Sequence, residues 1–266
     1  MEIGCKKYGY GNQALILIHG FGGKPSDWMQ YVSKLEAQFS IYIFNIRPFF
    51  SSNEPISFAQ QVKILTEVIE ENVTEFPVHI VGTSYGGTLT MALYLRLKSS
   101  VHRVTLINPM PPCMKTELKS KGIKLLLGLV DNQKSFEMLF NNYIGFYYLK
   151  KLAKVFLIDT GKSMNSRKFR LIKKAILRFR WIMVHFDYLR LNRGLLYHAP
   201  IHGDLIYSAQ DELFNEAVYL KLAKDLGLRS CRLENAGHMS AITHAEPISE
   251  LILSTKPQSL RHSRSS

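Results

Sequence analysis

Short apolar runs alternate with longer segments of helical periodicity along most of this chain. Six of the runs are almost continuously apolar, which is typical of parallel strands that are covered on both faces. These six runs are residues 15–19, 41–46, 78–82, 104–108, 205–208 and 230–233. The segments between them predict helices at residues 25–39, 57–75, 84–98, 211–226 and 240–253. Strands that alternate with helices form βαβ units, so we expect an α/β fold with a mostly parallel sheet flanked by helices.

Residues 110–199 interrupt this alternation, because they contain only helix-length stretches of apolar and basic residues. They hold 18 Lys and Arg but 5 Asp and Glu, whereas the remaining residues hold 16 of each kind. The whole net charge of +13 therefore lies in this interval, and charge that serves solubility alone would not be expected to segregate in this way. We predict a basic helical domain at 110–199, inserted into a core formed by residues 1–109 and 200–254, and a disordered tail at 255–266.

The most informative local motif is GTSYG at residues 82–86, with Ser84 at its centre. It ends an apolar strand and opens a helix, which is the setting of a nucleophilic serine on a sharp strand-to-helix turn. Glycines are required there because the two backbones approach closely and the serine takes a strained conformation. The alternative is a glycine-rich turn in which Ser84 only caps the helix.

A second glycine-rich motif, HGFGG at residues 19–23, also follows an apolar strand. Acyl transfer needs two backbone N–H donors at the tetrahedral oxyanion, one after the nucleophile and one from another loop. We predict that the N–H groups of Tyr85 and Phe21 form this oxyanion hole, and that His19 supports the loop by hydrogen bonding. A glycine loop can also hold a phosphate, but this one lacks the Lys-Ser/Thr of a P-loop and the spacing of a dinucleotide-binding fingerprint.

The acid and the general base that would activate Ser84 are expected after later strands. Asp211 follows the apolar run 205–208, with helix capping as the alternative role, whereas Asn108 ends the preceding strand but cannot serve as an anion. His238 lies in a glycine-containing loop after the last predicted strand. A single loop histidine is weak evidence, but the order Ser84, Asp211, His238 is one that nucleophile-elbow hydrolases use.

The four motifs HGFGG, GTSYGG, SAQDELF and AGHM resemble those of the α/β-hydrolase superfamily in order and spacing over essentially the whole chain. The resemblance implies an eight-stranded, mostly parallel sheet with a helical cap inserted after the sixth strand. Residues 1–11 depart from the family pattern, since they are too few for two well-formed leading strands.

These residues predict a serine hydrolase that cleaves a carboxylic ester or thioester, with Ser84, Asp211 and His238 as catalytic residues. Phe21, Tyr85 and Met239 are the candidate substrate-binding residues, and no metal or organic cofactor is expected. Three alternatives remain open: a receptor or binding protein that keeps the pocket but turns over little, a C–C bond hydrolase and an acyltransferase. A haloalkane dehalogenase would need a carboxylate nucleophile, and position 84 is a serine.

The basic residues at 110–199 also suggest which partners the protein has and where it is located. In residues 167–181 large apolar groups recur at helical spacing among Lys and Arg, which indicates either an ordinary cap helix with a solvated face or attraction to an anionic lipid surface or acyl group. We expect a small-molecule ester or acyl substrate, a lipid-like or anionic one included, and no nucleic-acid partner; the oligomeric state is left open. Three scattered cysteines, together with the absence of a signal-like or membrane-spanning run, predict a cytoplasmic protein with peripheral membrane contact as the alternative.

Overall fold

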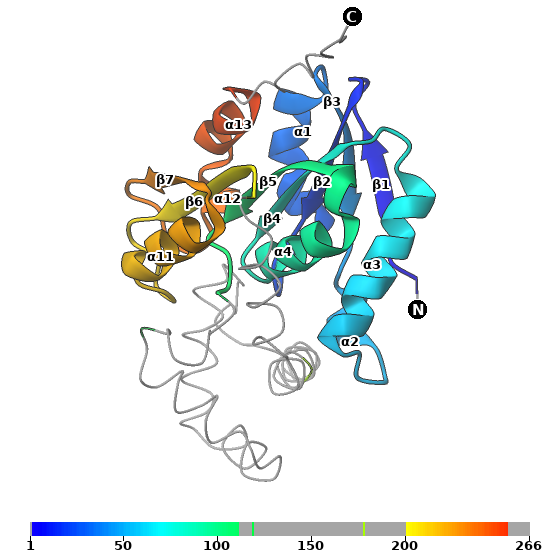
Figure 1. The fold of residues 1–266 in the computed structure, drawn as a ribbon, viewed down its shortest axis with the longest axis horizontal. Coiled ribbons are helices and arrows are strands. Elements are labelled where there is room, and N and C mark those ends of the chain that lie inside the picture. The colour runs from blue at the N-terminus through cyan, green and yellow to red at the C-terminus, as the bar shows by residue number, and fades with distance from the viewer. Residues whose placement is uncertain (1, 112–118, 120–177, 179–200, 255–266) are drawn as a thin grey trace, which may run out of the picture.

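The computed structural model describes residues 2–111, 119, 178 and 201–254. Within these residues the strands are β1 (Cys5–Tyr8), β2 (Gln13–Ile18), β3 (Phe39–Phe44), β4 (Val78–Thr83), β5 (Val101–Ile107), β6 (Gly203–Ser208) and β7 (Arg229–Leu233). They form one sheet in the order β1-β3-β2-β4-β5-β6-β7 (Figure 1). Only β1 runs antiparallel to its neighbour in this sheet. The predicted α/β fold and all six predicted strands are confirmed.

Helices cover both faces of the sheet (Figure 1). They are η1 (Pro25–Trp28), α1 (Met29–Leu35), α2 (Pro48–Ser51), α3 (Phe58–Asn72), α4 (Tyr85–Leu97), η2 (Lys98–Ser100), α11 (Glu216–Leu226), α12 (Ser240–Thr243) and α13 (Ala245–Ser254). Successive side chains of a strand point to opposite faces, so Ile16 packs in the core shared with α3, α4 and α11, and Leu17 in the core shared with α1 and α13. Burying each such side chain contributes about 1.5–3 kcal/mol.

In helix α3 the sequence determines both where the helix begins and which face is buried. The hydroxyl of Ser57 accepts from the Gln60 N–H, and the Gln60 side chain accepts from the Ser57 N–H at 2.8 Å, which is a capping box. The spacing of Val62, Leu65 and Ile69 places all three on one buried face, as their periodicity predicts.

Within the described residues, the sheet differs from two expectations. The described residues form a sheet of seven strands, whereas the resemblance implied eight; among them, β1 is the four-residue strand that precedes β2. The interval predicted as a helical cap follows β5, the fifth strand of the described sheet, whereas the resemblance implied a place after the sixth. Nearly all of residues 110–199, and the tail at 255–266, lie outside the described residues.

Three predicted helices have clearly different bounds. The helix expected at 25–39 begins as the 3-10 helix η1, continues as α1 and ends at Leu35. The helix expected from residue 211 begins at Glu216, because Asp211 accepts the N–H groups of Leu213 and Phe214 in a turn instead. The helix expected at 240–253 is divided into α12 and α13 at His244, whose φ and ψ of −129° and 40° are not helical. Short helix α2 was not predicted, since four residues show no periodicity.

The strand register brings the carboxyl ends of the parallel strands to one edge of the sheet. Ile18 pairs with Gly82, Thr83 with Ile107, and Ile107 with Ile206. The loops that follow β2, β4, β6 and β7 therefore meet at this edge, and they carry the HGFGG motif, Ser84, Asp211 and His238.

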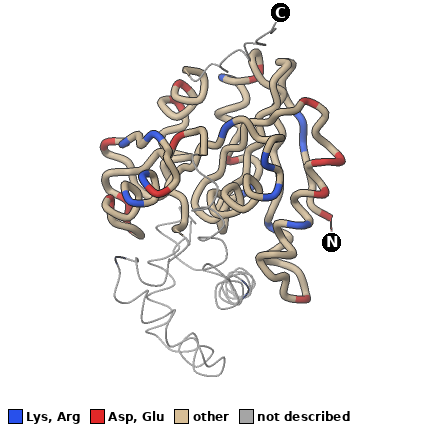
Figure 2. Tube along the Cα trace, in the orientation of Figure 1, with Lys and Arg blue, Asp and Glu red and all other residues tan. Residues whose placement is uncertain are grey.

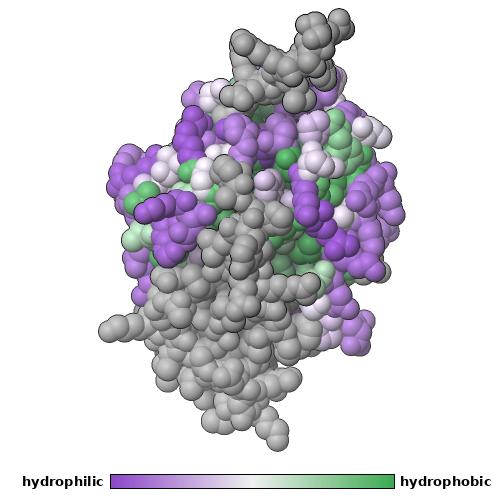
Figure 3. All heavy atoms as spheres, in the orientation of Figure 1, coloured by the Kyte–Doolittle hydropathy of each residue, from purple (hydrophilic) through white to green (hydrophobic). Residues whose placement is uncertain are grey.

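The surface of the described residues is mixed in character. Lys and Arg are interspersed with Asp and Glu along the described chain (Figure 2), as expected if the excess positive charge lies in 110–199. In the face shown in Figure 3, hydrophilic side chains gather on the flanks and hydrophobic ones toward the middle. No helix among the described residues is long and apolar enough to cross a membrane.

Candidate active site

Ser84 lies at the turn between β4 and α4 in a conformation that serine rarely adopts, with φ 51° and ψ −119°. Such backbone strain costs about 1–3 kcal/mol and persists only when the surroundings hold it. Here the Ser84 N–H donates to the carbonyl of Ile107 at 3.0 Å, and the Ser84 carbonyl accepts from the N–H groups of Gly87 and Met110, both at 3.0 Å. The neighbouring strand β5 and the first turn of α4 thus fix the direction of the serine side chain.

The glycines of the GTSYG motif are explained by close backbone approach. A Cβ on Gly82 would lie 2.4 Å from the carbonyl oxygen of Gly86, and a Cβ on Gly86 would lie 2.4 Å from that of Ile18. Any side chain at either position would push α4 away from the sheet. The tight strand-to-helix turn predicted from the motif is therefore present.

The three residues predicted to act together are in hydrogen-bond contact. His238 Nε2 lies 2.9 Å from Ser84 Oγ, and His238 Nδ1 lies 2.8 Å from Asp211 Oδ2. A carboxylate only accepts hydrogen bonds, so Nδ1 carries the imidazole proton and Nε2 is left to accept from the serine hydroxyl. The exposed fractions of Ser84, Asp211 and His238 are 8%, 1% and 0%.

The Asp211 carboxylate is held in an environment that keeps it ionised. Burial alone would raise its pKa, but the charge of His238 and the hydrogen bonds from His238, Tyr219 and the Phe214 N–H outweigh burial and lower the pKa below its usual value. Asp211 Oδ1 accepts from the N–H groups of Leu213 and Phe214 at 2.7 and 3.0 Å. Asp211 therefore does not cap α11, whose N-cap is Asn215; one carboxylate oxygen holds the turn before the helix, while the other faces His238.

The His238 loop is fixed by two residues that the sequence did not single out for this role. The Asn108 side-chain amide lies 2.9 Å from the His238 carbonyl, and Glu212 Oε2 accepts the His238 N–H at 2.7 Å. Asn108 is fully buried and adopts a φ of 41°. An asparagine at the end of a predicted strand was the available signal, since this residue type tolerates positive φ and bonds to nearby backbone.

The HGFGG loop lies directly against the serine turn. A Cβ on Gly20 would be only 3.0 Å from the Cβ of Ser84. Buried His19 bonds through Nδ1 to the Gly20 carbonyl at 2.9 Å and accepts the Ile46 N–H at Nε2 at 3.2 Å. Burial lowers the pKa of His19, in agreement with a neutral ring that supports the loop.

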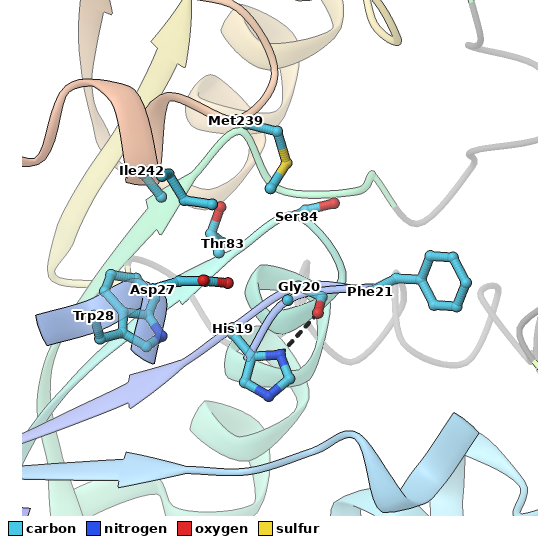
Figure 4. Close-up of a pocket in the computed structure, with 11 residues that line it drawn as sticks. His19, Gly20, Phe21, Asp27, Trp28, Thr83, Ser84, Met239 and Ile242 are labelled. Atoms are coloured by element: carbon cyan, nitrogen blue, oxygen red, sulfur yellow. Dashed lines mark hydrogen bonds between the residues drawn. The ribbon is translucent and has the colours of Figure 1, made fainter. Parts of the chain in front are cut away.

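A small cavity adjoins Ser84 on the side of η1 and α12 (Figure 4). Its lining residues are His19, Gly20, Phe21, Gly23, Asp27, Trp28, Thr83, Ser84, Met239, Ala241 and Ile242. Met239 lies beside Ser84, and the ring of Phe21 points away from Trp28. Two of the three predicted substrate-binding residues, Phe21 and Met239, thus line this cavity.

Tyr85, the third predicted substrate-binding residue, is placed differently. Its side chain is 1% exposed, donates to Gln61 Oε1 at 2.8 Å and packs edge-on against Phe50. It is not among the residues that line the cavity. The oxyanion role predicted for Tyr85 involves only its backbone N–H. Tyr85 is the first residue of α4, so this N–H directly follows Ser84 in the chain.

Among the described residues, no three His, Cys, Asp or Glu side chains gather as metal ligands.

Comparison with known proteins gives a family and several relatives. The family described as alpha/beta hydrolase fold matches residues 13–245. A curated relative from Pseudomonas putida, 2-hydroxy-6-oxononadienedioate/2-hydroxy-6-oxononatrienedioate hydrolase 1, is 25% identical over 167 residues. That match covers 58% of this chain and 53% of the relative, so it spans about half of that protein.

Solved structures resemble this chain over nearly its full length. An alpha/beta hydrolase fold protein from Burkholderia ambifaria has a TM-score of 0.71 at 14% identity, covering 95% of this chain and 94% of its own. A bromoperoxidase from Bacillus anthracis has a TM-score of 0.69 at 18% identity, covering 94% of each chain. The haloalkane dehalogenase DbeA from Bradyrhizobium elkani USDA94 has a TM-score of 0.72 at 14% identity, and the match covers 95% of this chain and 92% of the dehalogenase chain. At these identities the likeness shows the fold alone.

Proposed function

The chain belongs to the alpha/beta hydrolase family, and on that premise we propose that it hydrolyses a carboxylic ester or thioester of a small molecule through an acyl-enzyme on Ser84. The observation that carries the proposal is the unbroken hydrogen-bond path from Ser84 Oγ through His238 to Asp211, with steps of 2.9 and 2.8 Å. A serine hydroxyl is a weak nucleophile unless a positioned base removes its proton, and this path supplies such a base.

The first half of the reaction forms the acyl-enzyme. His238 Nε2 takes the proton of Ser84 as Oγ attacks the ester carbonyl, and Asp211 stabilises the positive imidazole. The carbonyl oxygen then carries the negative charge of the tetrahedral intermediate. When this intermediate collapses, the bond to the leaving alcohol or thiol breaks and His238 returns the proton to it.

The second half releases the acid. Water takes the place of the leaving group, gives a proton to His238 and attacks the acyl carbon, after which the bond to Ser84 Oγ breaks and the serine regains its proton. The N–H groups of Phe21 and Tyr85 would bind the oxyanion in both halves. Two features support this role: the HGFGG loop touches the serine turn, and α4 begins at Tyr85, so that the positive end of its dipole faces the site.

Substrate panels test the proposal. We expect 4-nitrophenyl esters of several chain lengths to be cleaved, and the Ser84→Ala protein to lose this activity while keeping its melting temperature. Equal turnover by the Ser84→Ala protein would end the proposed mechanism. A turnover count over the same panel separates an enzyme from a hydrolase-fold receptor, since a receptor would bind the esters but cleave less than one equivalent.

A second candidate is C–C bond hydrolysis, which the Pseudomonas putida relative favours by its name. The same three residues could serve it, so the panel should include a 2-hydroxy-6-oxo dicarboxylate beside the esters. A kcat/KM higher for that compound than for every ester would favour this candidate. An acyltransferase would instead form a new ester when an alcohol is added to the assay. Halide displacement needs a carboxylate nucleophile, and Ser84 does not provide one.

The predicted basic cap at 110–199 is kept as a proposal, supported by sequence alone. Its charge and interleaved apolar residues favour contact with an anionic lipid surface. Sedimentation with phosphatidylserine-containing vesicles should show binding that weakens as salt is raised, because salt screens this attraction. Binding that does not respond to salt, or none at low salt, would count against it.

A further inference from the structure

The Asp211 carboxylate receives a hydrogen bond that its own loop and the histidine do not supply. Three donors come from Leu213 N–H, Phe214 N–H and His238 Nδ1, and the fourth is the hydroxyl of Tyr219 on α11, 2.7 Å from Oδ2. Tyr219 and His238 thus share one carboxylate oxygen. A carboxylate offers about four acceptor sites, so the set of donors is complete.

The position of the Tyr219 ring does not depend on this hydrogen bond. The side chain is fully buried, stacks on Tyr207 at a centroid distance of 6.0 Å and an angle of 24°, and meets Phe214 edge-on at 6.2 Å. Ring contacts of this kind contribute about 0.5–1.5 kcal/mol beyond burial. A phenylalanine at position 219 can keep them while removing only the hydroxyl.

The hydroxyl remains a donor over the whole pH range in which such a site works. Burial, and then the charge of the neighbouring Asp211, raise the pKa of Tyr219 well above its ordinary value. The phenol is therefore neutral and points its proton at Oδ2 whether His238 is charged or not.

We propose that Tyr219 is a positioning residue of the triad: its hydroxyl fixes the rotation of the Asp211 carboxylate, so that Oδ2 faces His238 Nδ1, and it takes part of the negative charge away from that contact. This inference rests on the proposed function, because it concerns how Asp211 serves the histidine. The backbone N–H groups on Oδ1 already oppose rotation, and Tyr219 locks the second oxygen.

The test compares Tyr219→Phe with Tyr207→Phe. Each removes one hydroxyl from a stacked pair of rings, but the Tyr207 hydroxyl bonds Glu216 Oε1 at 2.8 Å and has no described contact with Asp211. We expect Tyr219→Phe to lower kcat for an activated ester about tenfold with KM nearly unchanged, the loss typical of a hydrogen bond to a charged group. Tyr207→Phe should match the wild type.

The pH profile separates positioning from loss of packing. Without the Tyr219 hydroxyl more negative charge remains at Oδ2, so protonated His238 is better stabilised and the acid limb of the kcat/KM profile should move to higher pH. Melting temperatures confirm that both variants are folded. A Tyr219→Phe protein with the wild-type rate and profile, or a loss that Tyr207→Phe shares, would overturn the inference.

A second readout needs no ester. The proton between His238 Nδ1 and Asp211 gives a low-field proton resonance, and we expect its position to change in Tyr219→Phe but not in Tyr207→Phe. If the wild type cleaves no ester, the proposed function fails, whereas the resonance still reports on Tyr219. An identical resonance in all three proteins would overturn the role of Tyr219 by itself.

Discussion

Asn108 joins the end of β5 to the loop of the proposed base, since its side-chain amide lies 2.9 Å from the carbonyl of His238. The same nitrogen lies 2.8 Å from Ser208 Oγ, and Asn108 Oδ1 accepts the Ser208 N–H at 2.8 Å. One buried side chain thus connects β5, β6 and the histidine loop. It stands at the end of the strand where an alternative acid could have been, and instead it holds the base in place.

Replacing Asn108 with Ala should lower both stability and activity. The Ser208 N–H and the His238 carbonyl lose buried partners, so we expect the free energy of unfolding to fall by about 2 kcal/mol or more and kcat to fall with it. Urea unfolding and ester turnover measure the two effects. Asn72→Ala is the matched control, because this exposed amide donates to the Val68 carbonyl on the same helix. Equal losses in both variants would contradict the role assigned to Asn108.

Replacing Gly86 with Ala should disrupt the serine turn. The new Cβ would lie 2.4 and 2.6 Å from the carbonyl oxygens of Ile18 and His19, and backbone atoms cannot give way as a flexible side chain can. We expect a loss of about 1–3 kcal/mol in unfolding free energy and little remaining ester cleavage. Gly4→Ala, where nothing lies within 4 Å, should leave both unchanged. A stable, active Gly86→Ala protein would refute the close approach.

Replacing Asp211 with Asn removes the charge but keeps the shape. The lowered pKa of Asp211 means that the wild-type carboxylate is ionised throughout a neutral assay. An amide cannot stabilise the charged imidazole and can impose the wrong tautomer, so kcat should fall by about 10³–10⁴-fold. Asp225→Asn, on the exposed part of α11, is the control and should retain normal activity. Comparable kcat values for the two variants would rule out Asp211 as the orienting acid.

Acid should weaken the fold through a buried histidine far from Ser84. Burial, then the charges of His102, Arg103 and His202, lower the pKa of His79 well below 6.5. Below pH 6.5 the unfolded chain therefore binds a proton at His79 that the folded chain does not bind. The free energy of unfolding falls as the pH drops below 6.5, with a slope approaching about 1.4 kcal/mol per pH unit. Urea unfolding of His79→Gln should show a smaller slope from pH 7 to 5.5. If His79→Gln keeps the wild-type slope, His79 is not the cause.

Local sequence patterns were sufficient to predict the elements in which a motif with catalytic residues lies directly at the end of a strand. The strands at 78–82 and 205–208 and the turn around Ser84 follow from short-range rules: apolar runs, close-packed glycines and a helix start. The motifs then placed Ser84, Asp211 and His238 in contact, because parallel strands bring their carboxyl ends to one edge. Tyr85 shows the limit, since the sequence could not tell that its side chain enters the core toward Gln61.

The missed features depend on contacts between distant segments. Asn108, Glu212 and Tyr219 gain their roles only when β5, β6, α11 and the histidine loop have packed together. The start of α11 was misplaced for a related reason, since the Asp211 carboxylate binds the N–H groups that a longer helix would have used. The number of strands depended on whether residues 1–11 form one strand or two, which periodicity in so short a segment does not decide.

Covalent labelling of Ser84 tests the central claim most directly. The protein is treated with a fluorophosphonate and digested, and the modified peptide is located by mass spectrometry, with the His238→Ala and Ser84→Ala proteins treated in parallel. The account predicts one equivalent of label on Ser84 in the wild type, much slower labelling in His238→Ala and none in Ser84→Ala. Absence of label from folded wild-type protein, or the same rate in His238→Ala, would contradict it.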